Sequence, residues 1–148
     1  LIVKMVLYFA YGSNMSASQM KKILGWDAPQ QAGSLKKFKI VFDQAGFFDS
    51  SWSPANIQPN NSDIVEGIIY SLEEKDLKKL DVYERYYERL EVEVVQSQET
   101  SIKAFAYYSP DSKEEKPPSK EYINLALQGR KFLSPGYLEK LKQYSVIG

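Results

Sequence analysis

The chain of 148 residues contains no cysteine and no histidine. Without cysteine it has no disulfide, no thiolate nucleophile and no cysteine-based metal site. Without histidine it lacks the commonest general base, the Ser-His-Asp and Cys-His triads, and the ligands of most zinc sites. Any acid–base chemistry therefore falls to carboxylates, tyrosine, lysine or the substrate itself.

A net charge and a long apolar run are missing as well. Lys+Arg and Asp+Glu both number 19, so the composition predicts neither a nucleic-acid-binding nor a membrane-binding surface. The apolar run at residues 1–10 is interrupted by Lys4 and is shorter than the roughly 18 apolar residues of a membrane helix. The sequence shows neither the positively charged start nor the cleavage site of small residues that would indicate a signal peptide. We therefore expect a cytoplasmic protein.

Aromatic residues are abundant instead, at 14% of the chain, and 11 of them are tyrosines. Because tyrosine has an apolar body and a polar tip, this composition suits a partly hydrated pocket. The length fits one domain, and an apolar content of 43% is enough for a sizeable core. We therefore expect a single domain over residues 1–148.

The hydrophobic pattern predicts the element order β α β β α β β α α. Strands are expected at residues 3–11, 32–42, 63–70, 87–97 and 102–108. Helices are expected at residues 15–24, 72–83, 119–132 and 135–144. This order favours an α+β fold, a small mixed, mostly antiparallel β-barrel with surrounding helices, closed or nearly closed.

Local signals support three of the helix starts. Ser16 or Ser18 is a candidate N-cap for the first helix, and Ser71 with Glu74 forms a capping box for the second. Ser134 before Pro135 predicts the start of the last helix.

Residues 43–61 are predicted to form a long loop. They are rich in Gly, Ser, Pro and Asn, and they include the aromatic residues Phe47, Phe48 and Trp52. Long loops of this kind usually serve a functional site.

The corner Tyr11-Gly12-Ser13-Asn14 is the first candidate site. It lies between an apolar strand and a helix start, an order that exposes consecutive backbone N–H groups on one side. Such a nest holds an anion, or an oxygen that gains negative charge during a reaction. The alternative is a plain turn, because Gly and Asn tolerate positive φ. A phosphate loop is excluded, since the Lys-Ser/Thr after a second glycine is missing.

Glu84 is the second candidate, expected where the helix of residues 72–83 ends. Three tyrosines surround it in the sequence: Tyr83, Tyr86 and Tyr87. Packing among them would remove the carboxylate from water and raise its pKa, which gives a base and acid near neutral pH. The alternative is a solvated carboxylate paired with Arg85 or Arg89.

Tyr107 and Tyr108 end a predicted strand and face opposite sides of it. One of the two is therefore free to line a pocket while the other packs outward.

Together these pieces resemble the γ-glutamylcyclotransferase-like (AIG2-like) family. The family's first strand ends in Tyr-Gly-Ser-Asn, and a Leu-Asp-x-x-Glu segment and a Tyr-x-Arg strand start follow. The matching residues are Tyr11-Gly12-Ser13-Asn14, Leu80-Asp81-Val82-Tyr83-Glu84 and Tyr87-Glu88-Arg89. Weaker matches are Val65 to Tyr70, Tyr107, Pro117-Pro118-Ser119 with Tyr122, and Pro135 to Leu141. The resemblance covers residues 6–144.

The resemblance implies a barrel with a cavity at one end. It also implies cleavage of a γ-glutamyl amide by intramolecular attack of the substrate's α-amine, with release of 5-oxoproline. It places the acid/base at Glu84, the substrate-binding loop at Tyr11, Gly12, Ser13 and Asn14, and a substrate contact at Tyr107. It implies no metal or cofactor and a small γ-glutamyl compound as the partner. The oligomeric state stays open, a homodimer included.

One residue departs from the family pattern. Arg85 stands where the family commonly has Gly after the catalytic Glu. Arg85 could pair with Glu84 and keep its pKa low.

Three hypotheses for the function follow. The leading one is a γ-glutamylcyclotransferase-type enzyme acting on a γ-glutamyl amino acid, peptide or amine. A related enzyme would take γ-glutamyl-ε-lysine or another acylated amine, with residues 43–61 setting that choice. The alternative of a different class is a catalytically silent member of the fold that binds a small metabolite or a partner protein.

Overall fold

The computed structural model describes residues 3–44, 51–96, 100–111, 113–144 and 146. The described strands form one closed barrel in the order β1-β3-β2-β4-β5. Their bounds are β1 Met5–Ala10, β2 Gln30–Val41, β3 Asn56–Glu73, β4 Glu88–Val95 and β5 Ser101–Tyr108. Neighbouring strands pair antiparallel, except that β1 and β5 close the barrel in parallel, with Tyr8 facing Phe105. The predicted α+β fold with a mixed, mostly antiparallel barrel is confirmed.

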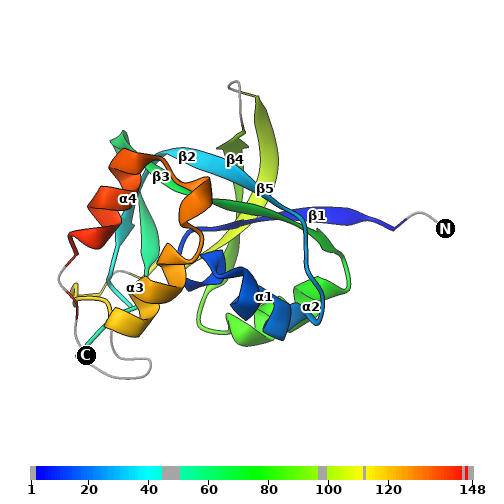
Figure 1. The fold of residues 1–148 in the computed structure, drawn as a ribbon, viewed down its shortest axis with the longest axis horizontal. Coiled ribbons are helices and arrows are strands. Elements are labelled where there is room, and N and C mark those ends of the chain that lie inside the picture. The colour runs from blue at the N-terminus through cyan, green and yellow to red at the C-terminus, as the bar shows by residue number, and fades with distance from the viewer. Residues whose placement is uncertain (1–2, 45–50, 97–99, 112, 145, 147–148) are drawn as a thin grey trace.

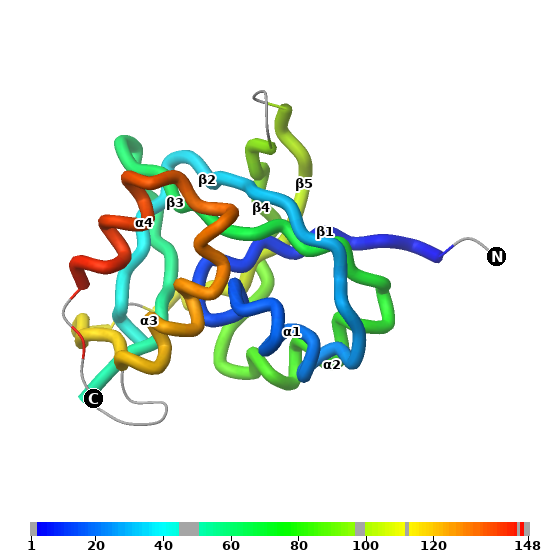
Figure 2. The backbone as a smooth tube through the Cα atoms, in the orientation of Figure 1, coloured from blue at the N-terminus to red at the C-terminus, as the bar shows by residue number. Residues whose placement is uncertain are grey.

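The helices lie outside the barrel in two pairs (Figure 1). One pair is α1 and α2, and the other is α3 and α4; their bounds are α1 Ala17–Leu24, α2 Asp76–Tyr83, α3 Lys120–Leu127 and α4 Pro135–Lys142. The tube in Figure 2 shows β1 running inward to the turn that precedes α1. That turn is the 3-10 helix η1, Ser13–Met15. Within the described part of the chain, no helix is long and apolar enough to cross a membrane.

The first strand is buried on both faces, which explains its continuous apolar sequence. Leu7, Phe9 and Tyr11 join a core built mainly from strand residues such as Val65 and Val94. The alternate residues join a second core, which the helices cover; from β1 these are Val6, Tyr8 and Ala10, and from the helices they include Met20, Leu80, Ala126 and Leu141. The strand alternation therefore directs successive side chains to the barrel interior and to the helices.

The helix starts at Ser16 and Ser134 are confirmed. Ser16, not Ser18, caps α1 by accepting a hydrogen bond from the backbone N–H of Gln19 at 3.2 Å. Ser134 caps α4 in the same way, with Pro135 in the first turn. The predicted helix of residues 119–132 is shorter than expected, because α3 ends at Leu127 and a separate 3-10 turn, η3 (Arg130–Phe132), follows.

The capping box predicted at Ser71 is wrong. Ser71 and Leu72 pair with β1 and extend β3 to Glu73. The helix begins later, at Asp76, whose carboxylate accepts a hydrogen bond from the backbone N–H of Glu73 at 2.9 Å. Pairing with β1 buries Leu72 completely, so the long-range sheet contact overrides the local capping signal.

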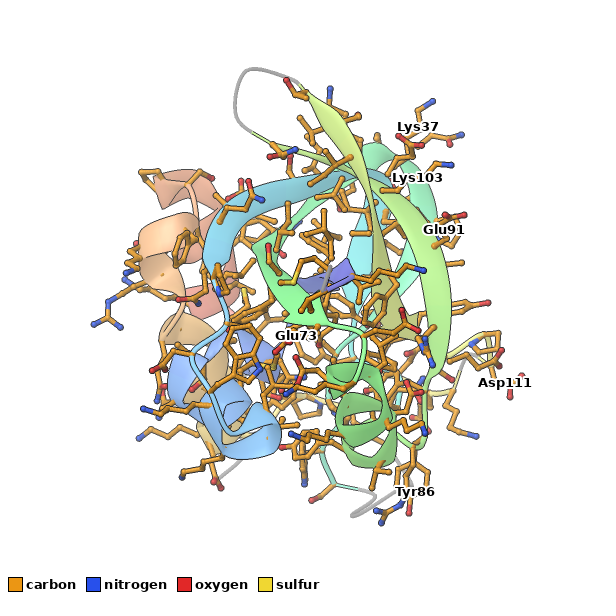
Figure 3. The ribbon with its side chains drawn as sticks, turned by 90° about the vertical axis from the view of Figure 1, so that its right-hand side faces the viewer. Lys37, Glu73, Tyr86, Glu91, Lys103 and Asp111 are labelled. Atoms are coloured by element: carbon orange, nitrogen blue, oxygen red, sulfur yellow. The ribbon has the colours of Figure 1, made fainter. Side chains whose placement is uncertain are left out.

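The loop predicted at residues 43–61 is shorter than expected, because β3 begins at Asn56. The polar first part of β3 pairs with the end of β2, on the far side of a bulge between Lys36 and Phe38. Lys37 at this bulge has a left-handed backbone, with φ of 67°, and it lies at the outer edge of the sheet in Figure 3. Phe47 and Phe48 lie outside the described residues.

Candidate active site

A cavity of about 600 Å³ opens where the turn after β1, the end of α2, the end of β5 and α3 meet. All six site residues predicted from the sequence line it: Tyr11, Gly12, Ser13, Asn14, Glu84 and Tyr107. The other lining residues used below are Tyr8, Gln19, Trp52, Pro54, Ala55, Tyr83, Arg85, Tyr87, Glu121 and Tyr122. The cavity has the size of a small-molecule site.

The turn after β1 forms because Gly12 starts a 3-10 helix. The backbone N–H of Met15 donates to the carbonyl of Gly12 at 3.0 Å, and that of Ser16 donates to Ser13 at 3.0 Å. Gly12 has φ of −123°, so positive φ is not the reason for glycine here. The reason is space, since a Cβ atom would stand 2.2 Å from the hydroxyl of Tyr122.

Asn14 connects this turn to Glu84. Its side-chain Nδ2 donates to Glu84 Oε1 and to the hydroxyl of Tyr8, both at 2.9 Å. Its Oδ1 accepts from Gln19 Nε2 at 2.8 Å, and its backbone carbonyl accepts from the Tyr70 hydroxyl at 2.6 Å. Because Asn14 is 3% exposed and bonded on every side, it holds the Glu84 carboxylate in one position.

Glu84 occupies the C-cap of α2, as the sequence predicts. Its backbone N–H donates to Leu80 at 2.8 Å, and its carbonyl accepts from the N–H of Tyr87 at 2.9 Å. Burial raises the pKa of Glu84 from 4.5 to about 7, although the hydrogen bond from Asn14 acts to lower it. The carboxyl group therefore both accepts and releases a proton near neutral pH.

The surroundings of Glu84 differ in part from the expectation. Tyr83 and Tyr87 line the cavity, whereas Tyr86 does not; Tyr86 is 42% exposed and lies at the outer edge of the molecule in Figure 3. Arg85 turns to Tyr86, with its guanidinium 5.0 Å from the ring centre, instead of pairing with Glu84. The expectation that Arg85 keeps the pKa of Glu84 low is wrong, because burial dominates that pKa.

Arg89, the other predicted partner of Glu84, pairs with Asp81 instead, at 2.6 Å. The second carboxylate oxygen of Asp81 accepts a hydrogen bond from the Tyr107 hydroxyl, also at 2.6 Å. Burial raises the pKa of Tyr107, so its hydroxyl stays protonated as a donor to Asp81. Asp81 and its partner Arg89 therefore hold Tyr107 in the cavity wall. The next residue, Tyr108, is partly buried against the core of strand residues.

The segment just before β3, residues 52–55, contributes another part of the cavity wall. Trp52, Pro54 and Ala55 line the cavity, so the described part of the predicted loop does border the site. The carbonyl of Ala55 accepts from the Tyr87 hydroxyl at 3.0 Å, and its N–H donates to the Tyr122 hydroxyl at 3.1 Å. The Trp52 ring packs against Tyr122, with ring centres 6.0 Å apart.

Sequence reasoning did not single out Gln19, Asp81 or Tyr122 as functional residues. Gln19 donates to both Ser13 Oγ and Asn14 Oδ1, at 3.1 and 2.8 Å. The sequence signal that could have identified Gln19 is its position three residues after the N-cap Ser16, where Glu or Gln is typical of a capping box. Asp81 and Tyr122 belong to the segments that carry the family resemblance. Their roles depend on partners far away in the sequence, which no local pattern reveals.

Comparisons with known proteins bear on the family and the fold of the chain. A family model described as Gamma-glutamyl cyclotransferase, AIG2-like matches residues 8–124. Among solved structures, the human uncharacterized protein loc79017 is 28% identical, with a TM-score of 0.88 over 97% of this chain and 89% of that chain. A gamma-glutamyl cyclotransferase is also 28% identical, with a TM-score of 0.87 over 97% of this chain and 90% of that chain.

A more distant structure shares the fold. YkqA from Bacillus subtilis is 23% identical, with a TM-score of 0.83 over 95% of this chain and 54% of that chain. Among curated proteins, none matches the chain.

Proposed function

Because the chain belongs to the gamma-glutamyl cyclotransferase, AIG2-like family, we propose that it releases 5-oxoproline from a γ-glutamyl amino acid, peptide or amine. One observation carries the proposal: Glu84 lines the cavity, accepts a hydrogen bond from Asn14, and has its pKa raised to about 7 by burial. A group that must take a proton and then return it works best with a pKa near the working pH.

The proposed reaction needs no nucleophile from the protein, which suits a chain without cysteine or histidine. The substrate's α-amine attacks the γ-carbonyl carbon and closes a five-membered ring, and Glu84 takes the proton from this nitrogen. The bond from the carbonyl carbon to the leaving nitrogen then breaks, while Glu84 passes its proton to that nitrogen. Holding the amine and the carbonyl together in the cavity supplies much of the rate.

The test is 5-oxoproline release, measured by mass spectrometry, from a panel of γ-glutamyl compounds. The cavity wall carries both Arg85 and Glu121, so the panel should include acidic, neutral and basic leaving groups. We expect product from at least one member with the unchanged chain. Glu84→Gln should lower kcat by at least about 10³-fold, because the amide keeps the shape and the hydrogen bond to Asn14 but cannot accept a proton.

Binding separates this mechanism from a silent, ligand-binding member of the fold. We expect Glu84→Gln to bind the preferred compound, measured by calorimetry, with a Kd close to that of the unchanged chain. Turnover by Glu84→Gln at the normal rate would rule out Glu84 as the acid/base. Binding without product from the unchanged chain would instead support the silent alternative.

A further inference from the structure

The hydroxyl of Tyr122 lies beside the turn where the sequence predicts an oxyanion-binding nest. A Cβ atom added at Gly12 of that turn would stand 2.2 Å from this hydroxyl. Ala55 donates its backbone N–H to the same hydroxyl at 3.1 Å. A protein hydroxyl therefore stands next to the backbone of the predicted nest, and it lines the cavity together with the turn.

The Tyr122 hydroxyl is an acceptor in the hydrogen bond that it makes within the protein. A phenol has two acceptor positions and one donor, and the backbone N–H of Ala55 occupies one acceptor position. Among the described residues, no protein acceptor receives the O–H of Tyr122. Because Tyr122 lines the cavity, its O–H is available to a ligand there.

Three other tyrosines of the cavity wall differ in this respect. Tyr11, Tyr87 and Tyr107 each donate their O–H to a protein oxygen: the carbonyl of Tyr107, the carbonyl of Ala55 and the carboxylate of Asp81. Tyr8 accepts from Asn14, the residue that also binds Glu84, so its hydroxyl stands on the proton-transfer side of the cavity. The Tyr122 hydroxyl is bonded instead to the backbone of Ala55.

The position of Tyr122 is held closely. Only glycine at position 12 leaves room for it, since an added Cβ would stand 2.2 Å from its hydroxyl oxygen and 3.2 Å from Cζ. The ring packs against Phe42 and Trp52, with ring centres 6.5 and 6.0 Å apart. A donor fixed before the substrate arrives needs no reorganisation during the reaction.

On the basis of the proposed function, we propose that the O–H of Tyr122 donates a hydrogen bond to the γ-carbonyl oxygen of the substrate. This bond stabilises the negative charge that the oxygen gains during the reaction. When the α-amine bonds to the carbonyl carbon, the π pair moves to this oxygen, which then accepts a shorter hydrogen bond from Tyr122. When the leaving nitrogen departs with the proton from Glu84, the pair returns and the carbonyl is restored. No proton leaves Tyr122 at any step.

Burial raises the pKa of the Tyr122 phenol, which keeps it protonated at neutral pH. It is therefore a hydrogen-bond donor and not a second base.

The test compares Tyr122→Phe with Tyr137→Phe. Tyr137 is also a buried phenol, but it lies on α4 in the helix-covered core and does not line the cavity. We expect Tyr122→Phe to lower kcat about 10²- to 10³-fold, with KM changed less than about threefold, because the lost bond strengthens only in the transition state. Tyr137→Phe should keep kcat within about twofold, and thermal unfolding reports whether each variant folds.

A second measurement covers the outcome that Tyr122→Phe does not fold. Replacing Tyr122 with 3-fluorotyrosine keeps the ring, the oxygen and the bond from Ala55, but makes the O–H a stronger donor. We expect kcat to rise severalfold at a pH below the phenol pKa, and an unchanged kcat would overturn the proposal. Gly12→Ala offers a further check, since its effect on kcat should largely disappear in a chain that also carries Tyr122→Phe.

The outcomes separate the two proposals. Normal or increased kcat in Tyr122→Phe, with product from the unchanged chain, overturns the role of Tyr122 and leaves the cyclotransferase activity standing. No 5-oxoproline from the unchanged chain with any panel member overturns the proposed function, and the role of Tyr122 with it.

Discussion

Asn14 makes hydrogen bonds to four other residues in and beside the candidate site. One buried amide contacts the turn through Gln19, the carboxylate of Glu84 and the phenol of Tyr8, while the backbone carbonyl of the same residue accepts from Tyr70. Its bond to Glu84 lowers a pKa that burial raises. The working pH of the proposed acid/base therefore depends on a residue that lies far from Glu84 in the sequence and is bonded to it in the fold.

Asn14→Ala should move the acid limb of kcat/KM to higher pH. Glu84 must be ionised to take a proton, so kcat/KM of the unchanged chain should fall below pH 7, the approximate pKa of Glu84. A hydrogen bond to a charged group contributes about 1.5 kcal/mol or more, which corresponds to about one pKa unit. The limb should shift upward by about that amount in a pH–rate profile with the preferred substrate.

Asn61→Ala is the control, because Asn61 is an exposed residue of β3 that does not line the cavity. Its pH–rate profile should match that of the unchanged chain. An acid limb in Asn14→Ala that stays in place, or moves to lower pH, would show that the bond from Asn14 does not set the pKa of Glu84.

The strands β1 and β3 approach each other closely beside the site, at Gly67. A Cβ at Gly67 of β3 would stand 2.3 Å from the backbone carbonyl oxygen of Ala10, the residue just before the turn, and 3.0 Å from the ring of Phe9. A backbone atom inside a barrel has little freedom to move. The absence of a side chain at Gly67 therefore lets β3 lie close to β1, the strand that leads into the turn of residues 11–14.

Gly67→Ala should lower the free energy of unfolding by about 1–3 kcal/mol, because the added methyl group overpacks a closed barrel. Gly136→Ala should have the opposite sign. Gly136 is exposed in α4 with no atom within 4 Å of an added Cβ, so alanine should add about 0.5–1 kcal/mol through its helix propensity. Urea denaturation measures both, and equal stability of the two variants would contradict the strand-contact argument.

Strands in which apolar and polar residues alternate strictly were predictable from the sequence. In β4, Leu90, Val92 and Val94 face the core while Glu91 and Glu93 face outward, as the pattern predicts. The start of β3 was not predictable, because residues 56–62 resemble a polar loop, whereas residues 56–59 pair with the end of β2. The capping box at Ser71 misled for the same reason, since its partner Leu7 lies far away in the sequence.

For the whole molecule, Glu84 links stability to pH. Its pKa rises from 4.5 to about 7 in the folded chain because of burial, so between these pH values the folded state binds a proton that the unfolded chain releases. The free energy of unfolding therefore falls as pH rises through this window. Since each pKa unit corresponds to about 1.4 kcal/mol, the loss above pH 7 is roughly 3 kcal/mol.

Glu84→Gln should not show this loss, because the amide does not titrate. Urea denaturation at several values between pH 4.5 and pH 8 measures it as the difference between the two chains, which removes the contribution of the other titrating groups. The variant should gain stability relative to the unchanged chain as pH rises. A difference that stays constant over the range would show that Glu84 is not desolvated in the folded state.

The sequence predicted residues that the structure brings around one cavity, but it did not predict the contacts between them. Glu84 and the turn of residues 11–14 line this cavity, and their roles stay predictions. The family resemblance could not reveal that Asn14 binds Glu84, that Asp81 accepts from Tyr107, or that Ala55 binds Tyr122. These contacts join elements distant in the chain, so they follow from the closure of the barrel and not from any local pattern.

The same closure has a consequence for the order of folding. Tyr8 of β1 meets Phe105 of β5, and the pairing is parallel, so the barrel cannot close until the chain is available as far as β5, which ends at Tyr108. Contacts of such long range make the search slow, because the entropy of a large loop is lost before the contact stabilises anything. During synthesis β1 must therefore wait for its second neighbour, and the turn that it carries acquires its final surroundings only when β5 has left the ribosome.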